Sequence, residues 1–421
     1  MKYNYSKIKP IYHCEIVIDE KLNLLKNLTI DGRISVDHFS IKGDHVIMVL
    51  SNEEIDLLKK MGFKIRIAVN ILERIEHVKE ALVESQPLIE AEGLLSGFVT
   101  NYMDAKQIID KFESLHNEFA NITQIIDLPH KTSGYDGSEV NLNGQSTIKL
   151  FRINTDKDKI KPGMLLISGT HAREWVPPLA SIEFAEQLLR SYSPVTSTNL
   201  QNTNKILDGL DIFIIPALNP DGINYSHHDD PNWRKNRNPN SPTGDSNCKG
   251  VDINRNYSVY WGEAGSSGDM CNDSFRGISA LSEAESQNVT YVLKKFNNIK
   301  TAVDCHSYGE DIFRPHPTGG IHIPTQPVTQ EEHEIYKDLE LSMNSAIASI
   351  TAGKQYSTGT TNNHAGTSDD YIYFAHHVFG FCLECGSENF DFWPPIEEAI
   401  KITKEVSAAL RTLAEHTVVM S

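Results

Sequence analysis

The hydrophobic residues in the first part of the chain follow two spacings, one typical of strands and one typical of helices. Strand-like runs cover residues 11–19, 45–50 and 63–69. Ser51 and Glu54 have the spacing of a capping box, apolar residues follow them at helical intervals, and Gly62 can end that helix. These patterns predict a small α+β unit.

The remainder of the chain alternates strands with helices over a much greater length. The predicted strands are residues 147–153, 163–170, 211–218, 301–307 and 377–385. The predicted helices are residues 176–192, 282–296 and 396–416. Several strands are continuously apolar, as expected when helices cover both faces of a sheet, so we expect one large α/β domain. Residues 219–280 are instead rich in Asn, Gly, Ser and Pro, and irregular segments of that length are usually functional.

The two patterned regions are separated by a stretch with no clear periodicity. A helical pattern over residues 73–84 gives way to residues 85–100, which contain Pro and Gly. We therefore predict one domain over residues 1–93 and a second over residues 94–421. The first is large enough to fold alone.

Composition and charge exclude some classes of partner. The 421 residues carry a formal net charge of −17, which disfavours binding to nucleic acid because phosphates would be repelled. No apolar run is long enough to span a membrane, and no apolar segment follows the early lysines as in a signal peptide. We expect a monomer without nucleic-acid or membrane partners. It would be secreted if a signal peptide precedes this sequence, and cytoplasmic otherwise.

Polar side chains with metal-binding chemistry stand at the ends of three predicted strands. His171 and Glu174 follow one strand, His306 follows a second, and Glu384 lies near the end of a third. Two imidazoles and a carboxylate are a typical ligand set for catalytic zinc, and they leave the fourth position for water. A glutamate beside that water can take its proton and pass it to a leaving amine. Each residue alone also has a plain structural explanation, such as a helix-opening polar residue, a hydrogen-bonded histidine or a glutamate paired with an arginine.

Arginines in the Asn-rich segment could recognise the substrate. Arg234 lies within NWRK at 232–235, and Arg255 follows Asn254 within DINRN at 252–256. A guanidinium binds a carboxylate through a planar fork and can also stabilise an oxyanion. In isolation, however, such arginines are ordinary surface residues.

Six motifs occur in one order along the chain: HAREW (171–175), LNPDG (218–222), NWRKNR (232–237), GVDINRN (250–256), HSYG (306–309) and GTSDDY (366–371). With them, residues from about 98 to 421 resemble the zinc carboxypeptidases of the pancreatic carboxypeptidase A/B type. The resemblance implies a mixed, twisted eight-stranded sheet flanked by helices. It also implies that the N-terminal unit is an inhibitory propeptide, which an activating protease would remove.

The resemblance assigns a role to each matching residue. One zinc ion would be bound by His171, Glu174 and His306. Glu384 would be the general base, and Arg234 would polarise the scissile carbonyl. The peptide's terminal carboxylate would be held by Asn254 and Arg255, with secondary substrate contacts from Arg173 and Tyr308. A disulfide found in many relatives would join Cys248 and Cys271. The substrates would be the C-termini of peptides or proteins.

Asp369 matches the base of the pocket that takes the terminal side chain. Relatives that cleave basic C-termini carry Asp there, so we expect a preference for Lys or Arg. The carboxylate would attract a cationic side chain and fail to satisfy an apolar one. Two alternatives remain at this stage: Asp369 or Asp370 could merely cap the following helix, or Arg314 could pair with Asp369 and neutralise it.

Two segments depart from the family pattern. Asn362 or Asn363 stands where relatives place a tyrosine that covers the substrate, and residues 385–395 also differ from the usual sequence. These departures leave two rival functions open. One is a zinc-bearing binding protein that has lost peptidase activity, and the other is an amidohydrolase of the same superfamily that acts on small acylated amino acids.

Overall fold

A computed structural model describes most of the chain. The ranges described are residues 11–18, 20–31, 33–34, 40–42, 44–70, 101–192, 201–239, 248–263, 265–316, 327–361 and 364–420. The predicted helix at 73–84 and the predicted domain boundary at 93 lie outside these residues.

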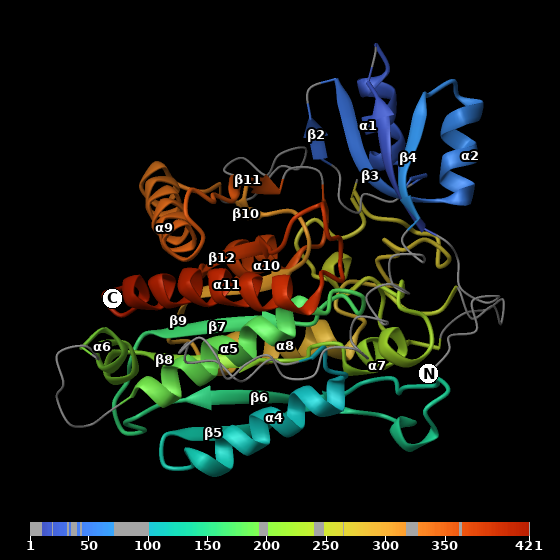
Figure 1. Ribbon diagram of the computed structural model, residues 1–421. Coiled ribbons are helices and arrows are strands. Elements are labelled where there is room, and N and C mark those ends of the chain that lie inside the picture. Colours follow the sequence, from blue (N-terminus) through green and yellow to red (C-terminus); the bar gives the residue numbers. More distant parts are fainter. Residues whose placement is uncertain are drawn as a thin grey trace.

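In the part of the N-terminal unit that the structure describes, two helices accompany a four-stranded antiparallel sheet (Figure 1). Its strands, in the order β2-β3-β1-β4, are β2 (Ser40–Lys42), β3 (His45–Ser51), β1 (Ile11–Val17) and β4 (Ile65–Asn70). Its helices are α1 (Leu22–Ile30) and α2 (Asn52–Lys60). The capping box of Ser51 and Glu54 is confirmed, since each side chain bonds to the other residue's backbone N–H. The unit has a hydrophobic core of its own.

The second unit is built on a mixed eight-stranded sheet, as the sequence predicted. Its strands, in the order β11-β10-β12-β9-β7-β8-β6-β5, are β11 (Ser357–Thr361), β10 (Asp311–Pro315), β12 (Phe379–Glu384), β9 (Ile299–His306), β7 (Gly163–Ser168), β8 (Asp211–Ile215), β6 (Thr147–Ile153) and β5 (Thr123–Lys131). The α-helices are α4 (Ala105–Glu118), α5 (Val176–Ser191), α6 (Gln201–Gly209), α7 (Pro220–His228), α8 (Ala284–Lys295), α9 (Gln330–Ile350), α10 (Ser368–His376) and α11 (Ile396–Thr417).

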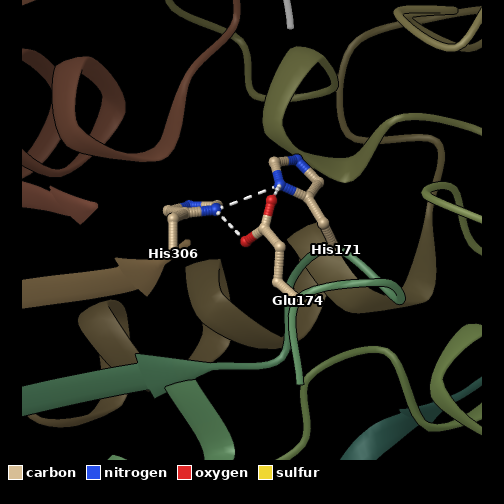
Figure 2. Close-up of side chains that lie close together, drawn as sticks. All are labelled: His171, Glu174 and His306. Atoms are coloured by element: carbon tan, nitrogen blue, oxygen red, sulfur yellow. Dashed lines mark hydrogen bonds and ion pairs between the residues drawn. The ribbon is translucent and has the colours of Figure 1, made fainter. Parts of the chain in front are cut away.

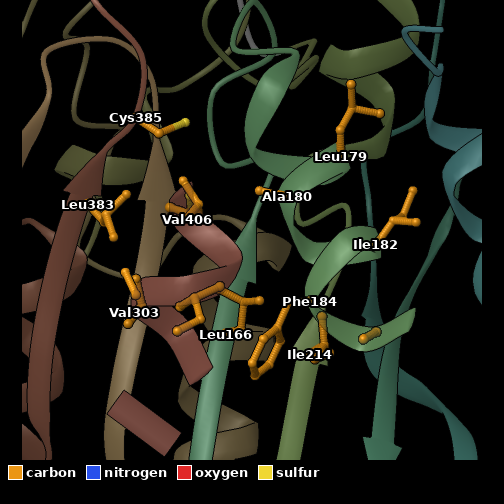
Figure 3. Close-up of a cluster of buried hydrophobic side chains, with 14 of the residues drawn as sticks. Leu166, Leu179, Ala180, Ile182, Phe184, Ile214, Val303, Leu383, Cys385 and Val406 are labelled. Atoms are coloured by element: carbon orange, nitrogen blue, oxygen red, sulfur yellow. The ribbon is translucent and has the colours of Figure 1, made fainter. Parts of the chain in front are cut away.

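Helices cover both faces of this sheet, which explains its continuously apolar strands. Alternate strand residues point to opposite faces, so Leu166 and Val303 pack on one side while Leu165 and Ala302 pack on the other. The first side is covered mainly by α5 and α11, which pack against each other, and Figure 3 shows Phe184 of α5 and Val406 of α11 beside the strand residues Leu166 and Val303. The second side is covered by α8 and α10.

The middle of the sheet determines where a site can form. Strands β12, β9, β7 and β8 are neighbours and run parallel, so their carboxyl ends meet at one edge. Glu384 pairs directly with His306 in the register of β12 and β9. Ligands of open α/β sheets bind at this edge.

The two units touch through one strand of the N-terminal sheet. Val46, Met48 and Leu50 of β3 point into that unit's own core, whereas Val49 points the other way and joins the main hydrophobic cluster of the second unit. Beside this contact lies a cavity of about 260 Å³, lined by both units. The lining includes Glu53 and Glu54 of α2 and Arg173 of the second unit.

The sequence patterns missed several elements. Strands β2, β5, β10 and β11 and helices α4, α6, α9 and α10 were not predicted, and helix α7 lies within the segment predicted to be a long loop. Among the described residues, no helix combines the length and apolar character needed to cross a bilayer.

Candidate active site

Three predicted metal ligands converge at the carboxyl edge of the sheet (Figure 2). His171 and Glu174 come from the turn between β7 and α5, and His306 is the last residue of β9. Nδ1 of His306 lies 3.0 Å from Oε2 of Glu174 and 3.1 Å from Nδ1 of His171. One ligand atom from each residue lies within 4.8 Å of the other two, and all three side chains are buried. This group is therefore placed to bind one metal ion.

Each histidine of this group has a carboxylate behind it. Nε2 of His171 lies 3.2 Å from Oδ1 of Asp252, and Nε2 of His306 lies 3.2 Å from Oδ2 of Asp304. A carboxylate at that position fixes the ring and keeps the hydrogen on the nitrogen that faces away from the metal. The sequence analysis assigned neither aspartate, because a ligand's supporting residue has no fixed spacing along the chain.

Glu384 lies beside the ligand group, at the end of β12. Burial raises the pKa of its carboxyl group to about 8, and the nearby Glu174 and Asp311 add to the rise while His306 and Arg234 oppose it. Among the described residues, its Oε2 atom has no hydrogen-bond partner. Glu174 shows the opposite behaviour. Burial would raise its pKa, but His171 and His306 hold it well below the usual value.

Arg234 reaches the ligand group from the loop after α7. Its Nε and Nη2 donate to Oδ2 of Asp252 at 3.1 and 3.0 Å. Its Nη1 points toward the ligand group, 3.3 Å from Nδ1 of His171 and 3.8 Å from Oε1 of Glu174. Asp252 thus fixes the direction in which this guanidinium can donate.

Asn254 and Arg255 form one short 3-10 turn close to the ligands. Nδ2 of Asn254 lies 3.5 Å from Nε2 of His306. Arg255 is buried, and its Nε donates to the carbonyl of Gly265 at 3.0 Å. Gly366 passes directly over this turn with a φ of +71°, and a Cβ there would lie 2.4 Å from the carbonyl oxygen of Arg255. Glycine is therefore required where the segment leading to α10 crosses the turn formed by Asn254 and Arg255.

Arg173 and Tyr308 meet on the other side of the site. Phe392 lies between them, with its ring 4.8 Å from the Arg173 guanidinium and 5.0 Å from the Tyr308 ring. Arg173 also donates to the carbonyl of Asn232 at 3.1 Å. This is the arginine that faces the cavity shared with the N-terminal unit.

Asp369 and Asp370 begin helix α10, and both are buried. Burial and the neighbouring Asp369 raise the pKa of Asp370 well above its usual value, while the nearby hydroxyl of Thr367 lowers it. The Asp369 charge is close enough to influence Arg255 and Cys382. Arg314 pairs with Glu340 of α9, so it is already engaged elsewhere.

The predicted disulfide is present between Cys248 and Cys271. Cys14, Cys305, Cys382 and Cys385 are buried free thiols. The bridge closes the segment that carries Asp252, Asn254 and Arg255. Asn362 and Asn363, which stand at the position of the covering tyrosine in relatives, lie outside the described residues.

Residues 114–409 match the sequence model of the zinc carboxypeptidase family. The chain is 30% identical to human carboxypeptidase A1 over 275 residues, which cover 64% of this chain and 62% of that protein. It is 28% identical to carboxypeptidase B of Astacus astacus over 325 residues, which cover 75% of this chain and 96% of that protein. The matched region therefore spans less than two thirds of human carboxypeptidase A1 but nearly all of the Astacus protein.

Solved structures agree on the fold. The carboxypeptidase A of Helicoverpa armigera superposes with a TM-score of 0.75 at 23% identity, and the alignment covers 98% of this chain and 99% of that one. Thrombin-activatable fibrinolysis inhibitor gives a TM-score of 0.74 at 19% identity, with the same coverage. Because the family match extends over most of the sequence and includes the His-Glu-His group, the chain belongs to the zinc carboxypeptidase family.

Proposed function

We propose that this protein is a zinc-dependent carboxypeptidase that removes single residues from the C-terminus of peptides, with a preference for Lys and Arg. The observation that carries the proposal is the meeting of His171, Glu174 and His306 with Glu384 at one edge of the sheet. Asn254 and Arg255 beside this group favour an exopeptidase, since they can hold a free carboxylate.

The ligand group fits zinc. Two imidazoles and one carboxylate converge, both histidines have a carboxylate partner, and the number of ligands leaves room for water. A bound zinc ion would lower the pKa of that water and polarise the carbonyl of the scissile bond.

The residues around the ion would carry the proton and the charges. Glu384 would accept a proton from the attacking water and return it to the leaving amine, and its free Oε2 supports this role. Nη1 of Arg234 would donate to the developing oxyanion, because Asp252 aims it at the ligand group. Arg255 would bind the terminal carboxylate and so restrict cleavage to the last peptide bond.

The preference for basic residues is supported by Asp369. This carboxylate is buried, and it is close enough to Arg255 to act on its charge. Arg314, the cation that could have neutralised it, is engaged by Glu340. Most of the similar proteins carry the name carboxypeptidase A and one is a carboxypeptidase B, so their names give no support to the basic preference.

One assay tests the proposal. Zinc content would be measured together with the release of free amino acids from matched peptides that end in Lys, Arg, Phe and Glu. We expect one zinc ion per chain and the highest kcat/KM on the Lys and Arg peptides. Zinc without any release would favour a binding protein, and release only from small acylated amino acids would favour an amidohydrolase. Equal or better cleavage of the Phe peptide would contradict the basic preference.

We also propose that the N-terminal unit inhibits the enzyme. The packing of Val49 against the second unit, and the cavity that both units line beside Arg173, support this role. No Lys or Arg occurs between Lys79 and Lys106, so an activating protease of trypsin-like specificity would have to cut at Lys79 or earlier.

The inhibition can be tested by weakening the contact. Val49→Arg should raise the peptidase activity of the full chain, because a charged side chain cannot remain in the apolar contact. Ile67→Arg is the control, since Ile67 lies on β4 of the same unit and is 45% exposed. Activity of the isolated second unit that does not fall on addition of residues 1–93 would argue against inhibition.

A further inference from the structure

Asp304 is a completely buried carboxylate whose partners come from three elements. Its Oδ1 accepts a hydrogen bond of 2.8 Å from Thr170, which follows β7. Its Oδ2 accepts one of 2.7 Å from Ser368, the first residue of α10, and faces Nε2 of His306 at 3.2 Å. Among the described residues, no Lys or Arg forms an ion pair with it. Burying a polar side chain is costly unless it is hydrogen-bonded, and here three separate groups meet one carboxyl group, an arrangement that an apolar residue could not provide.

The supports of the two histidine ligands differ in where they lead. Asp252 connects His171 to Arg234, on the side of the site assigned to the oxyanion. Asp304 connects His306 to Ser368, on the side that carries Asp369. Because Nδ1 of His306 faces the other ligands, its Nε2 is free to carry the hydrogen that points at Asp304.

We infer that Asp304 is a positioning residue, which holds the His306 ring for the metal and anchors the start of helix α10 to the same strand. The inference rests on the proposed function for the identity of the metal and for the meaning of Asp369. It concerns ring orientation, metal affinity and the order of one helix, so it can be tested without a peptidase assay.

Asp304→Asn is the informative change, because it preserves the shape of the side chain. The amide cannot be ionised and has a donor in place of one acceptor, so the three contacts cannot all persist in the same form. Loss of a carboxylate partner from a histidine ligand lowers metal affinity by about 10–100-fold. We expect that loss in a competition between the variant and a chromogenic zinc chelator.

A matched control lies on the same strand. Thr301 of β9 is buried, and its hydroxyl shares a hydrogen bond of 2.8 Å with Thr417 of α11, away from the ligand group. Thr301→Val should lower the Tm of the zinc-free protein yet keep zinc affinity within about twofold, since losing one buried hydrogen bond affects stability alone. The comparison separates a change at the metal from a general loss of stability.

The anchoring of α10 has its own measurement. Hydrogen exchange followed by mass spectrometry over residues 368–376 should be faster in Asp304→Asn and in Ser368→Ala than in the natural protein, and nearly unchanged in Thr301→Val. Unchanged exchange in both site variants would overturn the anchoring role.

The outcomes also distinguish this inference from the proposed function. If Asp304→Asn binds zinc as tightly as the natural protein, the positioning role is wrong, whatever the enzyme does. If zinc affinity falls as expected but the natural protein releases no amino acid from any peptide, the positioning role stands and the proposed function fails.

Discussion

The carboxylates at the two ends of the site are held in opposite electrostatic states. At the metal end, Glu174 and Asp252 are buried, but histidines and Arg234 hold their pKa values well below the usual range. Toward the pocket, burial and Asp369 raise the pKa of Asp370 well above its usual value, and burial raises that of Glu384, which lies between the pocket and the metal ligands, to about 8. The direction of each pKa shift therefore depends on whether the chain supplies a cation that outweighs burial.

This difference indicates what each region is built to receive. The carboxylates of the metal end are already compensated, so they can hold their neighbours rigidly. At Glu384, His306 and Arg234 lower the pKa by less than burial raises it, so an incoming cation would be a natural partner for this carboxyl group. We propose that zinc is that cation, and that a basic substrate side chain binds beside Asp369.

The largest expected effect is that of Glu384→Gln. The amide cannot take a proton from water, so kcat should fall by about 10²–10⁴-fold, the range for a general base. The zinc content should stay at one per chain, because His171, Glu174 and His306 are unchanged. Steady-state kinetics and metal analysis on the same sample check both halves, and a variant with the natural rate would disprove the mechanism.

The next effect concerns the pocket. Asp369→Ile should lower kcat/KM on peptides that end in Lys by about 30-fold or more, since removing one partner of an enclosed charge pair costs several kcal/mol. Cleavage of peptides that end in Phe should rise relative to Lys. Asp370→Asn is the control, because burial and Asp369 raise the pKa of Asp370, so an isosteric neutral amide should be tolerated there. An unchanged ratio of Lys to Phe cleavage in Asp369→Ile would place the specificity elsewhere.

A smaller effect is expected from removing the carboxylate that supports a metal ligand. Asp252→Asn should weaken zinc binding by about 10–100-fold, because His171 loses its carboxylate partner. Asp221→Asn is the matched control. Asp221 is equally buried but accepts hydrogen bonds from Gly134 and Ser146, outside the site. Chelator competition on both variants gives the measurement, and equal zinc affinities would contradict the support assigned to Asp252.

The smallest expected effect is a change in the number of protons released when zinc binds. With a pKa of about 8, Glu384 is mostly protonated at pH 7 before metal binds, and the positive ion lowers that pKa, so zinc binding expels the proton. Glu384→Gln should therefore release nearly one proton fewer than the natural protein at pH 7. At pH 9 the difference should shrink, because Glu384 is then largely ionised beforehand. Calorimetry of zinc binding in buffers of different ionisation enthalpy would count these protons, and identical counts at pH 7 would refute the raised pKa.

Much of the fold was visible in the sequence because it depends on local pattern. The buried strands β6, β7, β8, β9 and β12 are apolar runs, and the capping box of Ser51 and Glu54 is a local signal. Strand β11 (STGTT) and the short strand β10 carry little apolar signal, because they lie at and next to the edge of the sheet. Their pairing comes from neighbours distant in the sequence, which local periodicity does not report.

The site residues likewise fall into those that the sequence identified and those that it did not. His171, Glu174, His306 and Glu384 follow strands and could be singled out for their position. Asp252 and Asp304 could not, because their importance lies in contacts with residues 81 and 2 positions away in the chain, with no common spacing. The pairing of Arg314 with Glu340 likewise depends on how α9 packs beside β10.

The disulfide between Cys248 and Cys271 has a consequence for survival among other proteases. The peptide between the two cysteines contains Asp252, Asn254 and Arg255. The disulfide therefore joins the two ends of the segment that carries the residues proposed to bind the terminal carboxylate. A single cut within that peptide would leave each fragment attached to the body of the protein. Cleavage there would create two new chain ends without releasing the turn that carries Arg255. A cut in this peptide would therefore not by itself abolish the activity of the enzyme.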